Sequence, residues 1–233
     1  MLAKTVCIAV LALLVSSLCA AQEVSIDKSK IPVAADSPAK FVPSGWKIEE
    51  QVTGDLNGDG VADYALKLVE DKPATDSEGM ATERGRALVI ALKTGETLSR
   101  AAIADKLLQC THCGGAFYGV SESPADVTIE KGVIVVNQDH GSRNLANTTY
   151  RFRLDPATKK FVLIGFDYAD ADRLTANVVS ESTNYVTGVR ITTRGKGNRD
   201  TKTRTTVPRK KTVLDDVDYE KMEEAAVKRL GLG

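Results

Sequence analysis

The chain has 233 residues, of which 42% are hydrophobic, and its 31 lysines and arginines balance its 31 aspartates and glutamates. This length suits one domain with a sizeable core. Because the net charge is zero, no global electric field favours nucleic acid, and attraction to any anionic partner has to come from a local patch.

The first 21 residues have the three-part layout of a secretory signal peptide. A positive charge at Lys4 precedes an apolar run from Val6 to Leu14, and small residues at Cys19 and Ala21 suit cleavage after Ala21. The run is too short to cross a bilayer core of about 30 Å, and no later stretch is apolar enough to do so. We therefore expect an exported protein, periplasmic or extracellular, with no transmembrane segment in its mature chain.

Residues 22–44 differ from the rest of the mature chain in composition. They are polar, contain three prolines and show no sustained period of 2 or 3.6 residues. This pattern predicts an extended leader. From residue 45 onward we expect a single β-rich domain, over residues 45–233, that ends in a short helix.

Short runs with alternating apolar residues follow and are typical of half-buried antiparallel strands. Turns are predicted at Lys131-Gly132, where glycine can take a positive φ, at 155–160, where Pro156 cannot sit in a central strand, and at 195–198. The polar stretch 70–85 is too long for a hairpin turn and predicts a loop. The predicted strands are Gly45–Val52, Ala62–Val69, Arg86–Lys93, Leu98–Leu107, Asp126–Glu130, Val133–Asn137, Thr148–Leu154, Phe161–Asp167, Glu181–Arg194 and Thr201–Val207.

One helix is predicted, at the C-terminal end. Asp218 suits the N-cap, Gly231 can end the helix, and apolar residues recur between them at intervals of three or four. Because the hairpins follow one another without helical crossovers, the predicted fold is mainly β, with antiparallel hairpins that form a sandwich or a propeller-like array and one C-terminal helix.

The stretch from Asp55 to Asp63 has the spacing of a calcium-binding loop. Calcium needs several oxygen atoms at about 2.3–2.6 Å, which a loop supplies when alternate side chains point inward and a glycine permits a sharp bend. Position 12 is Leu66, where an EF-hand has a bidentate glutamate, so this is no EF-hand sensor. The predicted ligands, at loop positions 1, 3, 5, 7 and 9, are Asp55, Asn57, Asp59, the carbonyl of Val61, and Asp63.

The segment 53–64 resembles the calcium loops of integrin-type FG-GAP and VCBS repeats, in which a D-x-[DN]-x-D-G-x-x-D turn joins two strands of a propeller blade. That resemblance implies the same ligands. The sequence has no second copy of this loop, whereas a full propeller needs several repeats. The resemblance therefore implies the calcium loop and does not imply a propeller. The mature chain also looks like a group of uncharacterised exported bacterial proteins that combine one such loop with a Cys-Gly-Gly segment, here Cys113-Gly114-Gly115, and an Asn-Tyr-x-Thr-Gly turn, here Asn184 to Gly188. This second resemblance implies location and fold class, and no activity.

The same residues also suit a metal-free hairpin turn, since aspartate, asparagine and glycine are common in turns. If calcium binds, we expect it to stabilise the fold, because extracellular modules bind calcium weakly and the ion can hold a strand pair together.

After removal of the signal peptide, Cys110 and Cys113 are the only cysteines, in an oxidising compartment. A structural disulfide between them is the favoured interpretation. Their spacing also matches a thiol oxidoreductase, although Gly114-Gly115 opposes the helix that would stabilise a thiolate. A zinc site that adds His140 is a third alternative.

Asp139 and His140 are a carboxylate and a histidine that are adjacent in sequence, and they are the other candidate for a catalytic pair. A hydrolase would need a nucleophile and a base within hydrogen-bond reach, and adjacency in sequence does not supply that geometry. The alternative is a solvated loop histidine.

From Arg190 to Lys211, nine basic residues accompany one acid. This patch could bind an anionic envelope component, or it could be a charged hairpin that discourages aggregation at a sheet edge. No aromatic residues interleave for base stacking, so we expect no nucleic-acid partner.

The sequence is compatible with three functions. The favoured one is an exported, calcium-stabilised, non-catalytic binding or structural module. The alternatives are an extracytoplasmic hydrolase that uses Asp139 and His140 and a thiol oxidoreductase that uses Cys110 and Cys113.

Overall fold

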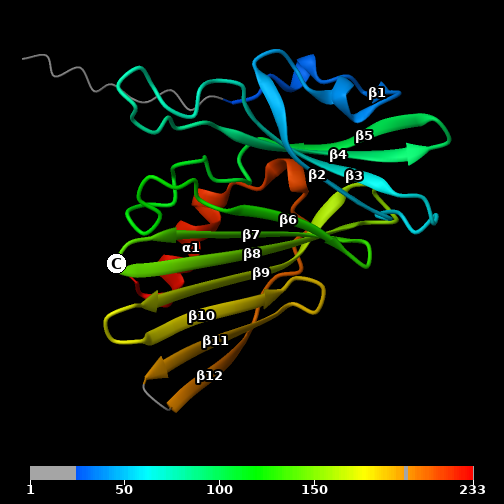
Figure 1. The fold of residues 1–233 in the computed structure, drawn as a ribbon. Coiled ribbons are helices and arrows are strands. Elements are labelled where there is room, and N and C mark those ends of the chain that lie inside the picture. The colour runs from blue at the N-terminus through cyan, green and yellow to red at the C-terminus, as the bar shows by residue number, and fades with distance from the viewer. Residues whose placement is uncertain (1–24, 197–198, 233) are drawn as a thin grey trace, which may run out of the picture.

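The computed structural model describes residues 25–196 and 199–232, so the predicted signal peptide at residues 1–21 lies outside the described residues. The described residues form two antiparallel sheets and one α-helix, which confirms the predicted fold class (Figure 1). In both sheets nearly every strand pairs with its neighbour in sequence, as successive hairpins require. The architecture is that of a β-sandwich.

The first sheet has the strand order β1-β5-β4-β3-β2. Its central strands β3 and β4 are apolar and buried along most of their length, because both faces of this sheet are covered. The predicted strands at 45–107 therefore agree with the structure, with small shifts at their ends. The bounds are β1 Ala34–Ala35, β2 Trp46–Gly54, β3 Asp63–Glu70, β4 Arg86–Thr94 and β5 Thr97–Ala104.

Residues 25–44 cover the outer face of this sheet and do not run as the extended leader that we predicted. They form the 3₁₀ helices η1 (Lys28–Lys30) and η2 (Pro38–Phe41), and β1 pairs with β5. Ile26, Ile31 and Phe41 are buried in one apolar cluster with the outward-facing residues of the sheet. These three residues dock the segment, with Ala35 and Val42 packed against the same cluster, although they follow no regular period.

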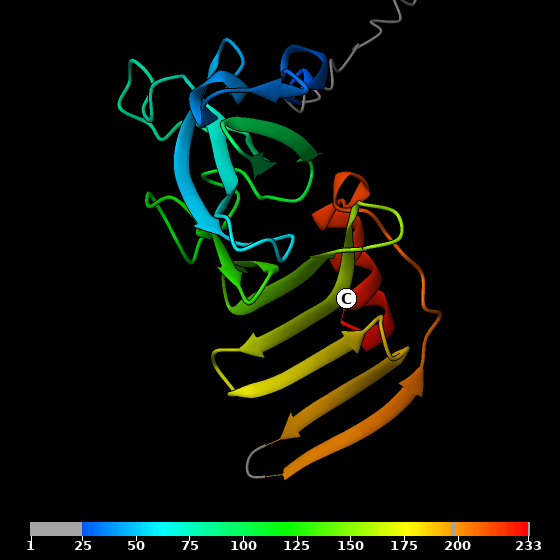
Figure 2. The same cartoon turned by 90° about the vertical axis from the view of Figure 1, so that its right-hand side faces the viewer.

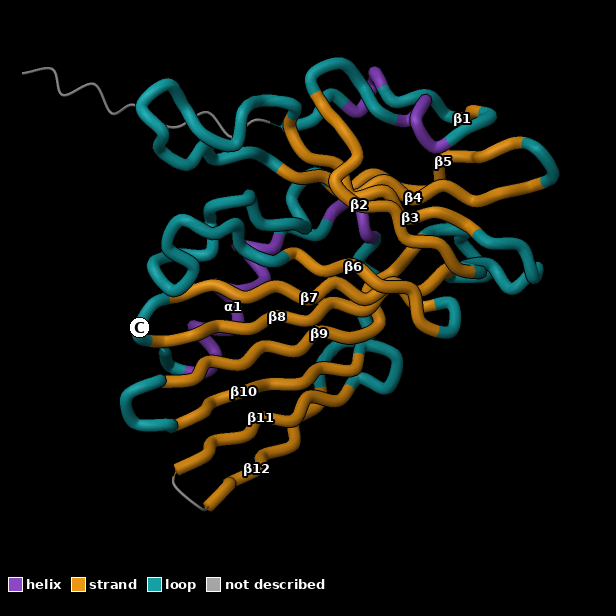
Figure 3. Tube along the Cα trace, in the orientation of Figure 1, coloured by secondary structure: helices purple, strands orange, loops and turns teal. Residues whose placement is uncertain are grey.

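The second sheet is a meander of seven strands in the order β12-β11-β10-β9-β8-β7-β6. The hairpin turn at Lys131-Gly132 is confirmed, with φ of 50° and 78°. Figure 3 shows the strands of both sheets and the loops that connect them. The bounds are β6 Ala125–Glu130, β7 Val133–Gly141, β8 Asn144–Leu154, β9 Phe161–Asp172, β10 Asn177–Asn184, β11 Val189–Lys196 and β12 Arg199–Thr206.

The prediction of a single strand over Glu181–Arg194 was wrong. The chain turns between β10 and β11, which pair with each other from Asn184 opposite Val189. The side chain of Asn184 accepts a hydrogen bond from the backbone N–H of Thr187 at 2.9 Å, and Gly188 has a φ of 70°. A side-chain hydrogen bond and one left-handed glycine therefore build the turn from Asn184 to Gly188 that the second resemblance implied.

The helix α1 (Tyr219–Leu230) has the predicted ends. The carboxylate of Asp218 accepts from the N–H of Lys221 at 3.2 Å, and Gly231 adopts the left-handed conformation with a φ of 66°. The short helix η3 (Leu214–Asp216) precedes it. Figure 2 shows α1 against one face of the second sheet, where Leu230 packs into the inner core. Within the described residues, no helix combines the length and apolarity that a membrane span requires.

Candidate functional site

The predicted calcium loop connects β2 to β3 at one end of the first sheet. The carboxylate of Asp55 accepts hydrogen bonds from the backbone N–H groups of Gly58 at 2.6 Å and Gly60 at 2.9 Å. These bonds hold the pKa of Asp55 below its usual range. Asn57 and Asp59 repeat the pattern, since the side chain of Asn57 accepts from the N–H of Asp59 at 2.9 Å and Asp59 from that of Val61 at 2.7 Å. The loop is therefore wound by its own acidic and amide side chains.

Asp63, the last predicted ligand, is fully buried and ties the loop to the rest of the sheet. One carboxylate oxygen accepts from the N–H of Leu56 and the other from the N–H of Lys93, both at 2.8 Å. Burial raises the pKa of the Asp63 carboxyl, and the carboxylates of Asp59 and Asp55 raise it as well. Asp63 therefore lies close enough to Asp59 and Asp55 to be repelled by both.

The fit of this loop to calcium rests on its exposed part. Asp55, Asn57, Asp59 and the carbonyl of Val61 supply four oxygen donors of the hard type that calcium prefers. Among the described residues, the carboxylates of Asp55, Asp59 and Asp63 do not place one oxygen each within 4.8 Å of the other two. Asp63 acts as an anchor in this structure, and its role as a ligand stays a prediction.

Cys110 and Cys113 form a disulfide, with their Cα atoms 5.1 Å apart. The two cysteines are half-buried and line a cavity of about 360 Å³. The cavity lies between this turn, the segment 83–86 at the start of β4, and the first residues of α1, including Tyr219.

Glu83, in the loop between β3 and β4, lies against both sulfur atoms. Its Oε1 is 3.0 Å from Sγ of Cys110 and 3.1 Å from Sγ of Cys113. Within the part of the chain that the structure describes, these three side chains are the one group of potential metal ligands with atoms within 4.8 Å of one another. The contact of Glu83 with the cysteines could not be predicted from the sequence, because 27 residues separate it from Cys110 and its loop shows no periodic pattern.

A buried arginine fixes the surroundings of the disulfide. Arg86 forms two hydrogen bonds to the carboxylate of Glu49, at 2.6 and 2.8 Å, and donates to the carbonyls of Ser123 at 2.9 Å and Cys110 at 3.3 Å. Paired and hydrogen-bonded in this way, the guanidinium can be buried at 5% exposure and holds the two ends of the 110–123 loop together.

Asp139 and His140 both lie in β7, and the structure does not bring them together as a catalytic pair. Asp139 accepts a hydrogen bond from the hydroxyl of Tyr118 at 3.3 Å and another from the side chain of Asn147. His140 pairs instead with Glu223 of α1, at 2.7 Å. Consecutive strand residues point to opposite faces of a sheet, which explains the separation. The zinc alternative with His140 has no support either, since His140 is committed to α1.

The basic stretch occupies β11, β12 and the segment that follows. Some of its charges are used internally: Arg190 donates to Thr183 at 2.8 Å, Arg194 donates to the carbonyl of Leu230 at 2.7 Å, and Lys211 pairs with Asp155 at 2.9 Å. The side chains of β12 are exposed throughout, and β12 is an edge strand of the second sheet. This arrangement suits an edge that is protected from pairing by charge.

The fold and these contacts define a two-sheet antiparallel β protein with one exposed acidic loop and one disulfide at a cavity. Comparisons with known protein families, with curated proteins and with solved structures find no match.

Proposed function

We propose that the protein is an exported β module whose first sheet is stabilised by calcium at the loop 55–63, and that its role is binding or structural. The observation that carries the proposal is the winding of this loop, in which Asp55, Asn57 and Asp59 each accept a backbone N–H from the loop itself. That winding keeps the polar side chains of alternate residues together at an exposed turn.

The charge of the loop also supports a cation. The carboxylates of Asp55 and Asp59 repel that of Asp63, and this repulsion adds to burial, the main reason that the pKa of Asp63 is raised. A divalent cation would remove this repulsion in the folded protein. It would stabilise the unfolded chain little, because the acids are far apart there.

The position of the loop explains how binding would stabilise the fold. The loop joins β2 to β3, and Asp63 connects it to Lys93 near the turn between β4 and β5. An ion at the loop would therefore oppose the separation of four strands. Because a ligand of the native state stabilises by mass action, 10 mM calcium with a dissociation constant of about 10⁻⁴–10⁻³ M would contribute about 1.4–2.7 kcal/mol.

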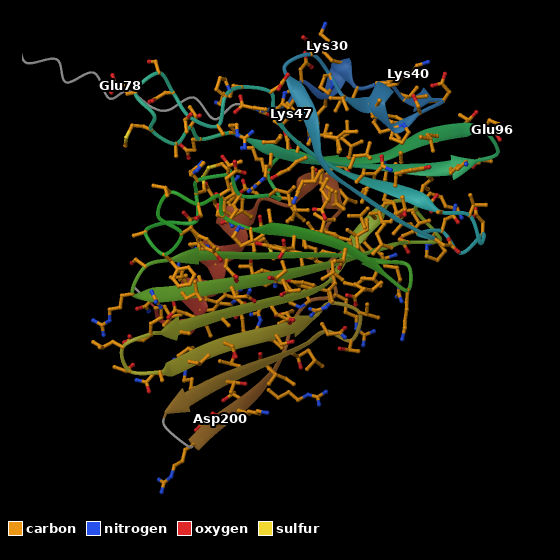
Figure 4. The ribbon with its side chains drawn as sticks, viewed as in Figure 1. Lys30, Lys40, Lys47, Glu78, Glu96 and Asp200 are labelled. Carbon is orange, nitrogen blue, oxygen red and sulfur yellow. A yellow bond between two sulfur atoms is a disulfide. The ribbon has the colours of Figure 1, made fainter. Side chains whose placement is uncertain are left out.

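The test is thermal unfolding of the mature protein with calcium titrated against a chelator. We expect calcium to raise Tm by about 3–10 °C, given that about 1 kcal/mol shifts Tm by about 2–4 °C in a domain of this size. Asp59→Ala should lose the shift, and Asp200→Ala, an exposed acid on β12 (Figure 4), should keep it. Equal shifts in both variants, or none in the wild type, would reduce the loop to an ordinary turn.

A further inference from the structure

We propose that the Cys110–Cys113 disulfide is redox-active and exchanges with peptide thiols in the adjoining cavity, with the Glu83 carboxylate as the group that transfers the proton. This inference is independent of the proposed calcium site, because it rests on residues outside the loop 55–63.

The contacts of Glu83 with the two sulfur atoms differ between the disulfide and the dithiol. A disulfide sulfur carries no proton, so the contacts of 3.0 and 3.1 Å from Glu83 Oε1 to the two sulfurs cannot be hydrogen bonds in the oxidised protein. In the dithiol, either thiol can donate to that oxygen. Glu83 thus lies where it gains a bonding partner only when the disulfide is reduced.

Hydrogen bonds of the neighbouring residues fix the position of Glu83. Its neighbour Arg84 exchanges hydrogen bonds with Thr111, whose N–H donates to the carbonyl of Arg84 at 3.0 Å and whose hydroxyl accepts from the N–H of Arg84 at 3.1 Å. On the other side, the carbonyl of Thr82 accepts from the hydroxyl of Thr111 at 3.3 Å. Thr111 lies between the cysteines and is 0% exposed.

These bonds do not involve the sulfur atoms, so they persist when the S–S bond breaks. The turn is also closed by a backbone bond from the N–H of Cys113 to the carbonyl of Cys110 at 3.4 Å. A disulfide across two intervening residues restrains the unfolded chain less than one that closes a long loop. The fold should therefore tolerate reduction, since this disulfide contributes less to stability than one that closes a long loop.

The disulfide and Glu83 are accessible from the cavity. The two cysteines are half-buried, Glu83 is exposed, and all three line the cavity of about 360 Å³. A space of that size admits a cysteine side chain with parts of its neighbouring residues, or a small peptide thiol. Leu108 and Tyr219 supply apolar surface in the same cavity, whose charged lining holds more acids, such as Glu70 and Asp105, than bases, such as Lys72.

The exchange takes place in two thiol–disulfide steps. An external thiol gives its proton to the Glu83 carboxylate, and its thiolate attacks one sulfur to form a mixed disulfide. The electron pair of the broken S–S bond passes to the other sulfur, which takes the proton back from Glu83. A second external thiol, whose proton follows the same route, releases the first as its disulfide. Two thiols are thereby oxidised to one disulfide, and Cys110 and Cys113 gain two electrons and two protons.

The test is reduction of the native mature protein by glutathione, with free thiols counted by alkylation and mass measurement while circular dichroism reports the fold. We expect reduction of the folded protein at pH 7, slowed roughly tenfold in Glu83→Gln. This is less than the roughly hundredfold or more that a general acid–base group contributes in an enclosed site, because Glu83 is exposed. Glu83→Asp, which keeps the carboxylate on a shorter side chain, should recover part of the rate.

The matched control is Glu78→Gln, on the outer end of the same loop (Figure 4), and its rate should equal that of the wild type. Thiols released only at the rate of global unfolding would assign a structural disulfide and overturn the proposal. Equal reduction rates in Glu83→Gln and the wild type would remove Glu83 from the mechanism.

Discussion

His140 of β7 and Glu223 of α1 are joined by an ion pair, with 2.7 Å between Nε2 and Oε1. The two residues lie on different layers of the molecule, so this contact holds the helix to the second sheet. The hydrogen bond to Glu223 raises the pKa of His140 above the value of a free histidine, against the opposing effect of burial.

The pair should make stability depend on pH. Because the pKa of His140 is higher in the folded protein than in the unfolded chain, its contribution is complete below about pH 6.5 and is lost as the pH rises through the folded-state pKa. We expect Glu223→Gln to lower the free energy of unfolding by about 1–2 kcal/mol at pH 5.5 and by much less at pH 9. Urea unfolding at both pH values tests this. Glu224→Gln, exposed on the same helix, is the control, and an equal loss at both pH values would contradict the prediction.

Removal of the Asp63 side chain should destabilise the first sheet even without calcium. Asp63→Ala leaves the N–H groups of Leu56 and Lys93 without their acceptors, at a cost of about 2–3 kcal/mol. Asp59→Ala removes an acceptor only from the exposed loop and should cost less than about 1 kcal/mol. Denaturant unfolding with chelator present compares the two variants. Equal losses would mean that Asp63 does not anchor the loop.

The N-terminal segment should contribute to stability through Phe41. This side chain is 0% exposed in the outer core, so Phe41→Ala should lower the free energy of unfolding by about 3–5 kcal/mol. Val33→Ala, at a position that is 73% exposed in the same segment, should change it by less than about 0.5 kcal/mol. A loss below about 1 kcal/mol for Phe41→Ala would show that the segment is not docked in solution.

The stability of the fold should depend on the ion pair between the buried carboxylate of Glu181 and Arg229. Glu181 lies on β10 with a side chain that is 0% exposed, and Arg229 of α1 donates two hydrogen bonds to it, one of them at 3.1 Å. Arg229→Met keeps the apolar stem but leaves the carboxylate with Arg190 alone, at 3.7 Å, so it should cost about 3 kcal/mol. Lys228→Met, at an exposed position on the same helix, is the control in thermal unfolding. An equal loss of stability in both variants would show that the Glu181–Arg229 pair does not stabilise the fold.

Local features determined most of the elements. The turn at Lys131-Gly132 and the helix ends at Asp218 and Gly231 were predicted because a turn or a cap depends on a few adjacent residues. Alternation of side chains located the strands for the same reason. The strand over 181–194 was predicted wrongly, because the turn from Asn184 to Gly188, which the second resemblance had implied, divides it into β10 and β11.

By itself the sequence determined the β class, the hairpin order, the acidic loop and the cysteine pair, since each is written in residues close along the chain. Only the tertiary structure decided what these groups contact. Glu83 reaches the cysteines across 27 and 30 residues, His140 faces a helix far along the chain, and three scattered apolar residues dock the N-terminal segment. Such contacts arise from how loops and layers pack, and no periodic pattern along one segment encodes them.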